Sequence, residues 1–199
     1  MKQKPIVNPY TMCGRLTVVT GPMFSGKSTQ LLRYKRKYSV LKKQVLCIKH
    51  ASDSRYSIDS ISTHDREEIQ ATSVTHLYDI SFESLKTIDV VLIDEGHFYD
   101  DLFSWVSTVV DMMDIHVVVA GLFADYRRVP LQNMVRIMAH ADKILVLSAY
   151  CIDCANDGIE REAHFTSRLP GIDRERVVGG ADMYQSRCRK HYLESKIKE

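Results

Sequence analysis

The feature that most constrains this chain of 199 residues is a glycine-rich stretch, GPMFSGKST, at residues 21–29. An apolar run (GRLTVVT) precedes it, and a segment with helical spacing follows from about residue 27 to residue 41. This is the strand–loop–helix context of the P-loop pattern G-x-x-x-x-G-K-[ST], in which backbone N–H groups and the helix N-terminus surround phosphate oxygens. Lys27 is expected to reach the β- and γ-phosphates, and Ser28 is expected to offer its hydroxyl group to Mg²⁺. The residues predicted here to bind ATP and its Mg²⁺ are Gly21, Pro22, Met23, Phe24, Ser25, Gly26, Lys27, Ser28 and Thr29.

Further apolar runs alternate with helical patterns along the first two-thirds of the chain. They predict strands at residues 14–20, 45–49, 87–93, 116–120 and 143–147. Residues 101–113 have apolar positions on one helical face, and Pro130 is expected to open another helix that ends near residue 139. Strands that are apolar throughout and separated by helices are typical of a parallel sheet covered on both faces. The predicted fold class is therefore α/β, a P-loop NTPase-like parallel sheet flanked by helices, with ligands at the carboxyl ends of its strands.

An acidic pair, Asp94-Glu95, directly follows the apolar residues 90–93. In P-loop proteins an Asp at this place holds Mg²⁺. Glu95 fits two roles beside the phosphates. It could remove the proton from an attacking hydroxyl group, as in a kinase, or polarise a water molecule, as in an ATPase. Its position after the strand does not decide between them.

Two pairs of potential metal ligands have the spacing of zinc knuckles. A C-x-x-C motif and a later C-x-x-H motif supply four ligands of the kind that tetrahedral Zn²⁺ prefers, and four protein ligands make a structural site. Such a site would stabilise a lobe that is too small to hold a core of its own. The predicted zinc ligands are Cys151, Cys154, Cys188 and His191.

The composition helps to separate classes of function. With 27 basic and 25 acidic residues the formal net charge is only +2, which argues against a nucleic acid as the main partner. Neither a membrane span nor a signal peptide is expected, because no long apolar run is present, so we expect a cytoplasmic protein without a membrane partner. The N-K-x-D signature of GTPase switches is absent, which makes ATP the expected donor. The alternative to a kinase is a nucleic-acid-dependent P-loop ATPase with a zinc ribbon.

In combination these motifs resemble the small zinc-containing thymidine kinase family of cells and large cytoplasmic DNA viruses. The matching stretches extend from residue 14 to about residue 192. Besides the P-loop and the knuckles they include DSRYS at 53–57, THD at 63–65, DEGHF at 94–98 and GGADMY at 179–184. The resemblance implies transfer of the γ-phosphate of ATP to the 5′-hydroxyl group of thymidine, which supplies thymidine monophosphate for DNA synthesis.

The resemblance also implies roles for individual residues. Glu95 becomes the general base on the 5′-hydroxyl group, and Lys27 and Arg55 act on the transferred phosphoryl group, whose spread-out negative charge a cation stabilises. Asp53 helps with the metal or positions Arg55. A loop of the zinc lobe, at about 165–184, covers the nucleoside. The residues expected to bind the nucleoside are Met23, Phe98, Leu122, Tyr126, Thr166, Val177, Val178, Gly179 and Tyr184.

The expected organisation has four parts. These are a flexible N-terminal extension (1–13), the P-loop ATP-binding α/β domain (14–148), a zinc-binding lobe with the nucleoside-binding loop (149–192) and a tail (193–199). The family further implies a homotetramer, feedback inhibition by thymidine triphosphate and a cytoplasmic location, in the host cell for a viral member. The chain departs from the commoner family pattern at His191, where many members have Cys, and at His97, where Gln is commoner.

Overall fold

The computed structural model describes residues 13–52, 60–62, 68–169 and 180–197. Its centre is a six-stranded sheet in which every neighbouring pair of strands is parallel, with the order β5-β2-β6-β7-β1-β8. The strands are β1 (Arg15–Thr20), β2 (Val45–His50), β5 (Thr72–Val74), β6 (Val90–Ile93), β7 (His116–Gly121) and β8 (Lys143–Val146). The predicted parallel α/β sheet is confirmed.

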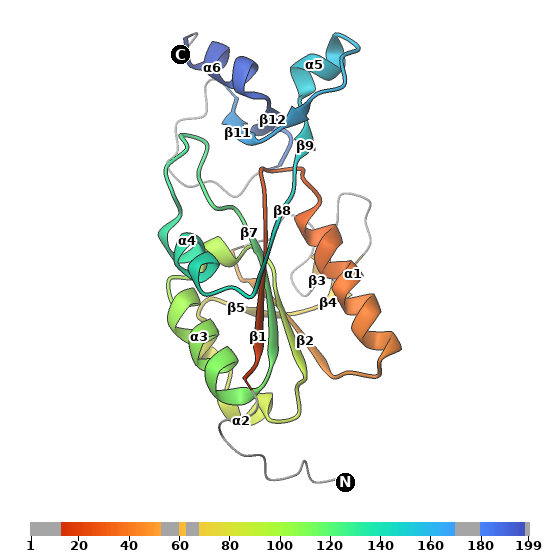
Figure 1. The fold of residues 1–199 in the computed structure, drawn as a ribbon, viewed down its shortest axis with the longest axis vertical. Helices are drawn as coiled ribbons and strands as arrows, with labels where there is room; N and C mark the ends of the chain where they lie inside the picture. Colours follow the sequence, from red (N-terminus) through yellow and green to blue (C-terminus); the bar gives the residue numbers. More distant parts are fainter. Residues whose placement is uncertain (1–12, 53–59, 63–67, 170–179, 198–199) are drawn as a thin grey trace.

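Helices cover both faces of this sheet, as Figure 1 shows. Helix α1 lies on one face, and helices α3 and α4 lie on the other. The helices of this part of the chain are α1 (Lys27–Val40), η1 (Leu77–Asp79), α2 (Phe82–Leu85), η2 (Gly96–Phe98), α3 (Leu102–Met113) and α4 (Gln132–Ala139). This three-layer arrangement explains why the central strands, such as β6 and β7, are almost entirely apolar, since both of their faces are removed from water.

Alternate residues of the central strands supply two separate hydrophobic cores. In β6, Val91 and Ile93 pack on the side of α3, whereas Val90 and Leu92 pack with Leu31 of α1. The other central strands alternate in the same way, because successive side chains of a strand point to opposite faces. The two cores hold the sheet rigid, and that rigidity positions the loops at its carboxyl edge.

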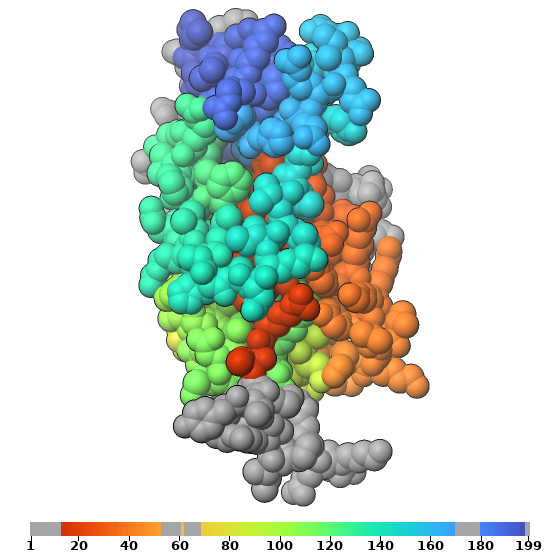
Figure 2. All heavy atoms as spheres, viewed as in Figure 1, coloured from red at the N-terminus to blue at the C-terminus, as the bar shows by residue number. Residues whose placement is uncertain are grey.

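A small lobe stands at the carboxyl end of the sheet, in cyan to dark blue at the top of Figures 1 and 2. It contains two antiparallel strand pairs, β9 with β10 and β11 with β12. Its elements are β9 (Ala149–Tyr150), α5 (Ile152–Asn156), β10 (Glu162–Ala163), β11 (Phe165–Arg168), β12 (Tyr184–Arg187) and α6 (Arg189–Ile197). A further antiparallel pair, β3 (Ser60–Ser62) with β4 (Glu68–Gln70), forms a separate small sheet, and Ile61 of β3 packs into the core on the side of α1.

Three expectations about element boundaries were wrong. Residues 87–89 precede β6 instead of belonging to it, because the chain is still turning after α2, where the backbone N–H of Ile88 donates to the carbonyl oxygen of Leu85 at 2.9 Å. Pro130 does not open α4; it forms an isolated bridge with Ala124, and the helix begins at Gln132. Helix α6 continues to Ile197 and so includes most of the residues that we expected to form a tail.

No helix in the described part of the chain is both long enough and apolar enough to cross a bilayer. Residues 1–12, which make up nearly all of the expected N-terminal extension, lie outside the described part of the chain.

His116, at the start of β7, provides a pH-dependent contribution to stability that can be measured. Its ring nitrogens contact the hydroxyl groups of Thr17 (2.9 Å) and Tyr38. Burial, aided by the positive charge of Arg15, lowers the pKa of His116 to about 4. The folded protein therefore holds the imidazole neutral, whereas the unfolded chain binds a proton below its ordinary pKa of 6.5. The resulting stability is complete above pH 6.5 and is lost as the pH falls towards 4.

We expect His116→Gln to remove this pH dependence. Between pH 7 and pH 5 the free energy of unfolding of the wild type should fall by about 1 kcal/mol more than that of the variant, a value reduced for the partial exposure of the ring. Urea unfolding of both proteins at the two pH values measures the difference. If the free energy of unfolding fell by the same amount in both proteins, His116 would not be the source of the pH dependence.

Candidate active site

The P-loop connects β1 to α1 at the carboxyl edge of the sheet. Gly21 has φ 153°, and a Cβ atom there would lie 2.4 Å from the carbonyl oxygen of Leu147, so only glycine fits. Gly26 has φ 82° in the left-handed region and forms the N-cap of α1. The buried Lys27 ammonium group donates to the carbonyl oxygens of Pro22 (2.7 Å) and Gly21 (3.3 Å). The loop therefore combines a helix N-terminus with an enclosed cation, which is the chemistry that a polyphosphate requires.

The acidic pair after β6 lies against the start of α1. The hydroxyl group of Ser28 donates to Asp94 Oδ2 at 2.9 Å, and the backbone N–H of Glu95 donates to Asp94 Oδ1 at 3.0 Å. Two oxygen ligands for a hard cation, the Ser28 hydroxyl and the Asp94 carboxylate, thus lie side by side next to the phosphate loop. The structure brings these two predicted residues together.

Glu95 has an unusual backbone conformation for a residue other than glycine, with φ 48° and ψ 43°. Such conformations cost on the order of 1–3 kcal/mol and are concentrated at functional sites. The next residue, Gly96, packs closely against the sheet: an added Cβ atom there would lie 2.5 Å from a methyl group of Val119. These constraints place the Glu95 carboxylate 3.4 Å from Nδ1 of His97, with only 14% of the Glu95 side chain exposed.

His97 connects this acid to the segment that follows β7. Its Nδ1 atom lies 3.3 Å from the backbone nitrogen of Leu122, which donates to it. The His97 ring also lies 4.3 Å from the ring of Phe98, measured between centroids. His97 therefore links Glu95 to Phe98 and Leu122, two residues that were predicted to bind the nucleoside. In the sequence, His97 stood out as a departure from the commoner family pattern.

The other predicted nucleoside residues in the described chain lie where the small lobe meets the P-loop. The backbone N–H of Met23 donates to the Thr166 hydroxyl at 3.0 Å. Tyr126, after β7, and Tyr184, in β12, both accept hydrogen bonds from the guanidinium group of Arg168. Sequence reasoning did not include Arg168 in the site. The one available signal was its place two residues after Thr166, which is the spacing of side chains on the same face of a strand.

Five predicted site residues lie outside the described residues. They are Asp53 and Arg55 of the DSRYS motif and Val177, Val178 and Gly179 of the nucleoside-covering loop.

A mostly apolar cavity of about 220 Å³ adjoins the P-loop on the side of the small lobe. It shares Gly21, Pro22 and Thr166 with the predicted site. Its other walls come from the start of β11 and the residue before it, from α4 and from the segment between β7 and α4, namely Phe123, Ala124, Asp125, Arg128, Pro130, Val135, His164 and Phe165. Of the predicted nucleoside residues Thr166 lines this cavity, whereas Tyr126 and Tyr184 do not, so the cavity adjoins the predicted nucleoside site without coinciding with it.

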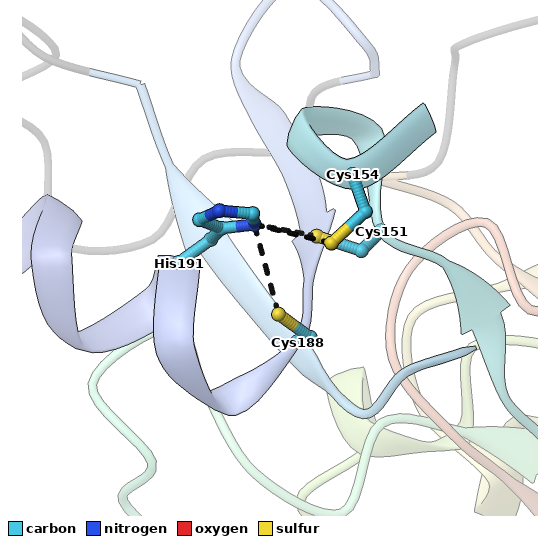
Figure 3. Close-up of side chains that lie close together, drawn as sticks. All are labelled: Cys151, Cys154, Cys188 and His191. Atoms are coloured by element: carbon cyan, nitrogen blue, oxygen red, sulfur yellow. Dashed lines mark hydrogen bonds between the residues drawn. The ribbon is translucent and has the colours of Figure 1, made fainter. Parts of the chain in front are cut away.

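The two knuckles form one compact cluster of potential metal ligands, and their side chains point toward one another (Figure 3). The Nδ1 atom of His191 lies 3.3 Å from the sulfur of Cys151, 3.4 Å from that of Cys154 and 3.7 Å from that of Cys188. All four ligand atoms lie within 4.8 Å of one another. Cys151 and Cys154 come from the start of α5, Cys188 lies between β12 and α6, and His191 lies in the first turn of α6.

The chemistry of these ligands fits a metal ion. Burial and the neighbouring thiols Cys151 and Cys188 raise the pKa of Cys154 to about 11. A divalent cation would replace the thiol protons and neutralise the thiolates, which makes such a cluster a favourable soft-ligand site. The predicted set of four metal ligands is therefore assembled in the structure as a Cys3His cluster that could hold a structural metal.

The metal cluster and the phosphate loop are packed against each other. Phe24 of the P-loop packs against the small apolar cluster formed by Ala149, Ala163 and the three knuckle cysteines. The hydrogen bond between Met23 and Thr166 adds a second link between loop and lobe. The small lobe thus supports the P-loop as well as the predicted nucleoside residues.

Comparison with known proteins agrees with this site. A sequence model described as thymidine kinase matches residues 14–192. The thymidine kinases of Variola virus and of Vaccinia virus (strain Western Reserve) are each 35% identical to the chain over 182 residues, which is 92% of this chain and 98% of the relative. The thymidine kinase of Monkeypox virus has the same identity and coverage. The chain belongs to the thymidine kinase family.

Proposed function

We propose that the protein transfers the γ-phosphate of ATP to the 5′-hydroxyl group of thymidine, producing thymidine monophosphate and ADP. The observation that carries the proposal is the grouping of the P-loop, Ser28, Asp94 and Glu95 at one edge of the sheet, in a chain of the thymidine kinase family. The alternative, a nucleic-acid-dependent ATPase, is not favoured, because the relatives are named for a kinase activity.

In this proposal the P-loop amides and Lys27 hold the β- and γ-phosphates. Ser28 and Asp94 would hold Mg²⁺, which would neutralise part of the negative charge of the phosphates. Glu95 accepts the proton of the 5′-hydroxyl group while the oxygen bonds to the γ-phosphorus. The bond from that phosphorus to the β–γ bridging oxygen breaks, and ADP leaves with the electron pair. Arg55 is proposed to stabilise the transferred phosphoryl group, and Asp53 to assist the metal or Arg55.

The nucleoside is proposed to lie between the sheet edge and the small lobe. The residues proposed to contact it are Met23, Phe98, Leu122, Tyr126, Thr166, Val177, Val178, Gly179 and Tyr184. An enclosed pocket of this kind accepts a pyrimidine with a 5-methyl group and rejects larger purines by shape. It also keeps water away from the γ-phosphate, which limits hydrolysis of ATP.

Several further properties are proposals that rest mainly on family membership. We propose that the Cys3His cluster binds Zn²⁺, and that residues 149–192 act as the zinc lobe beside an ATP-binding domain at 14–148. We further propose that the protein acts in the cytoplasm and that thymidine triphosphate inhibits it by feedback. We also propose a homotetramer. In its support, edge strand β8 exposes 41% of Ile144 and 66% of Val146, which is unusual for an unpaired strand edge.

Two deoxy analogues test the proposed position of transfer. With labelled ATP, 3′-deoxythymidine should become phosphorylated, and 5′-deoxythymidine should not, because it lacks the attacking hydroxyl group. The latter should still inhibit competitively against thymidine, since it keeps the base and most of the sugar. Label on 5′-deoxythymidine would place the transfer at another hydroxyl group and contradict the proposal.

A further inference from the structure

Arg168, at the end of β11, is buried among residues that are proposed to bind the nucleoside. Only 7% of it is exposed. Its guanidinium carbon lies 3.9 Å from the centre of the Tyr126 ring, and one terminal nitrogen donates to the Tyr126 hydroxyl at 3.2 Å. The other terminal nitrogen donates to the Tyr184 hydroxyl at 3.5 Å. One cation therefore joins two tyrosines that come from distant parts of the chain.

The pairing of β11 with β12 explains how Arg168 reaches both rings. In the antiparallel register Arg168 lies directly opposite Tyr184, and side chains opposite each other in such a pair lie on the same face. Thr166 lies two residues earlier in β11 and shares that face. Through Thr166 the same strand contacts the P-loop at Met23. A single strand thus links the phosphate loop to the two tyrosines.

The opposite side of β11 is held by helix α6. The hydroxyl group of Ser167 lies 3.2 Å from that of Ser195, and it accepts a hydrogen bond from Arg187, also at 3.2 Å. These contacts leave β11 little freedom to shift, so the position of Arg168 is well defined.

The backbone and the ring of Tyr126 are held by different groups. The Tyr192 hydroxyl of α6 donates to the carbonyl oxygen of Tyr126 at 2.8 Å, which holds the backbone. Three cations of the described residues lie near the ring centre, and the guanidinium carbon of Arg168 is the nearest at 3.9 Å, against 5.3 Å for the Lys196 ammonium nitrogen and 5.5 Å for the Arg127 guanidinium carbon. Arg168 is also the group that holds its hydroxyl end. Loss of Arg168 should therefore free the ring without releasing the segment.

We infer that Arg168 is a positioning residue of the nucleoside site, which fixes the rings of Tyr126 and Tyr184 relative to each other. The inference rests on the proposed function. A planar guanidinium group can stack on one ring and donate to two hydroxyl groups at once, whereas a lysine ammonium group cannot do both. A site that is ordered before the ligand arrives binds it more tightly, because the ligand does not have to order the side chains. Arg168 should therefore affect nucleoside binding more than phosphoryl transfer.

The test compares Arg168→Met and Arg168→Lys with the wild type in steady-state kinetics. The KM for thymidine should rise on the order of tenfold in Arg168→Met, as expected for loss of charged hydrogen bonds. The kcat and the KM for ATP should change by less than about threefold. The reason is that Arg168 would support thymidine binding equally in the ground state and in the transition state, and the contacts to the phosphates are kept. Arg168→Lys should recover only part of the affinity. Arg161→Met, the same change at an exposed arginine of this lobe, should match the wild type.

A double-mutant cycle with Tyr126→Phe gives the sharper result. Removing the hydroxyl group should raise the KM for thymidine in the wild type but have no further effect in Arg168→Met, because the interaction is already lost there. Additive effects of the two changes, or a KM in Arg168→Met within about twofold of the wild type, would overturn the inference. If Arg168→Met does not fold by circular dichroism, unchanged KM values in both Arg168→Lys and Tyr126→Phe would overturn it.

The wild-type control separates this inference from the proposed function. If the wild type phosphorylates thymidine but the KM for thymidine is unaltered in the Arg168 and Tyr126 variants, only the role of Arg168 is overturned. No turnover of thymidine by the wild type overturns the proposed function and the inference together.

Discussion

The Glu95→Gln variant is expected to phosphorylate thymidine with a kcat lower by a factor on the order of 10²–10⁴, which is the usual contribution of a general base. Glutamine keeps the size and polarity of the side chain but cannot accept the proton of the 5′-hydroxyl group. Asp94 does not replace it, because its carboxylate is engaged by the Ser28 hydroxyl and by the backbone of Glu95. Initial rates at saturating ATP and thymidine measure the effect.

A matched control for this variant is Glu83→Gln. Glu83 lies in the first turn of α2, where its exposed carboxylate pairs with Lys86 at 2.6 Å. The same chemical change there should leave kcat within about twofold of the wild type, since surface ion pairs contribute little. If Glu95→Gln kept its kcat within about tenfold of the wild type, Glu95 would not be the general base.

Cys188→Ser is expected to lower metal content and stability together. Removing one of four ligands weakens a site whose metal contributes directly to folding, so the free energy of unfolding should fall by several kcal/mol, on the order of 3 or more. The effect should extend to ATP. Because Phe24 packs on the cysteine cluster and Met23 binds Thr166, loosening the lobe releases the P-loop. Metal analysis, urea unfolding and the KM for ATP give the three measurements.

Two other variants make this test specific for metal binding. Cys13→Ser changes an exposed cysteine far from the cluster in sequence and should leave metal content and stability unchanged. His191→Cys should keep the metal, because zinc accepts either ligand in a tetrahedral site. A Cys188→Ser protein with full metal content, or a wild type that holds no metal after growth in zinc, would contradict the metal assignment.

The main sheet could be predicted from the sequence because each central strand carries its own signal. Residues such as Val90 to Ile93 are apolar without a break, and this pattern arises only where both faces are buried. The P-loop and the two knuckles could also be predicted from the sequence, since their function depends on residue types at fixed spacings. The strand order, in contrast, depends on contacts between distant segments, which no local pattern records.

The elements that the sequence did not reveal are mostly short. Strand β5 has three residues and strands β9 and β10 have two each, too few for an alternating pattern to stand out. The end of the chain was misjudged for a different reason. Helix α6 is polar on most of its surface, and it is held by contacts of Tyr192 and Ser195 with Tyr126 and Ser167. A helix stabilised in this way shows little amphipathic pattern.

The site was predicted in its parts but not in its connections. The sequence indicated Glu95, Tyr126, Thr166 and Tyr184 by their places in family motifs. It did not indicate that Glu95 adopts a left-handed backbone conformation, or that Arg168 lies between the two tyrosines. Both facts depend on tertiary packing, the first on the close approach of Gly96 to Val119 and the second on the register of β11 with β12.

The central claim is that the γ-phosphate of ATP goes to thymidine. The most direct measurement incubates the protein with Mg²⁺ and γ-labelled ATP, with and without thymidine, and with single-stranded DNA in a parallel reaction, and then follows the label. We expect the label on thymidine monophosphate, no more free phosphate than the background without thymidine, and no effect of DNA. Label released only as free phosphate, unaffected by thymidine and increased by DNA, would contradict the account and identify an ATPase instead.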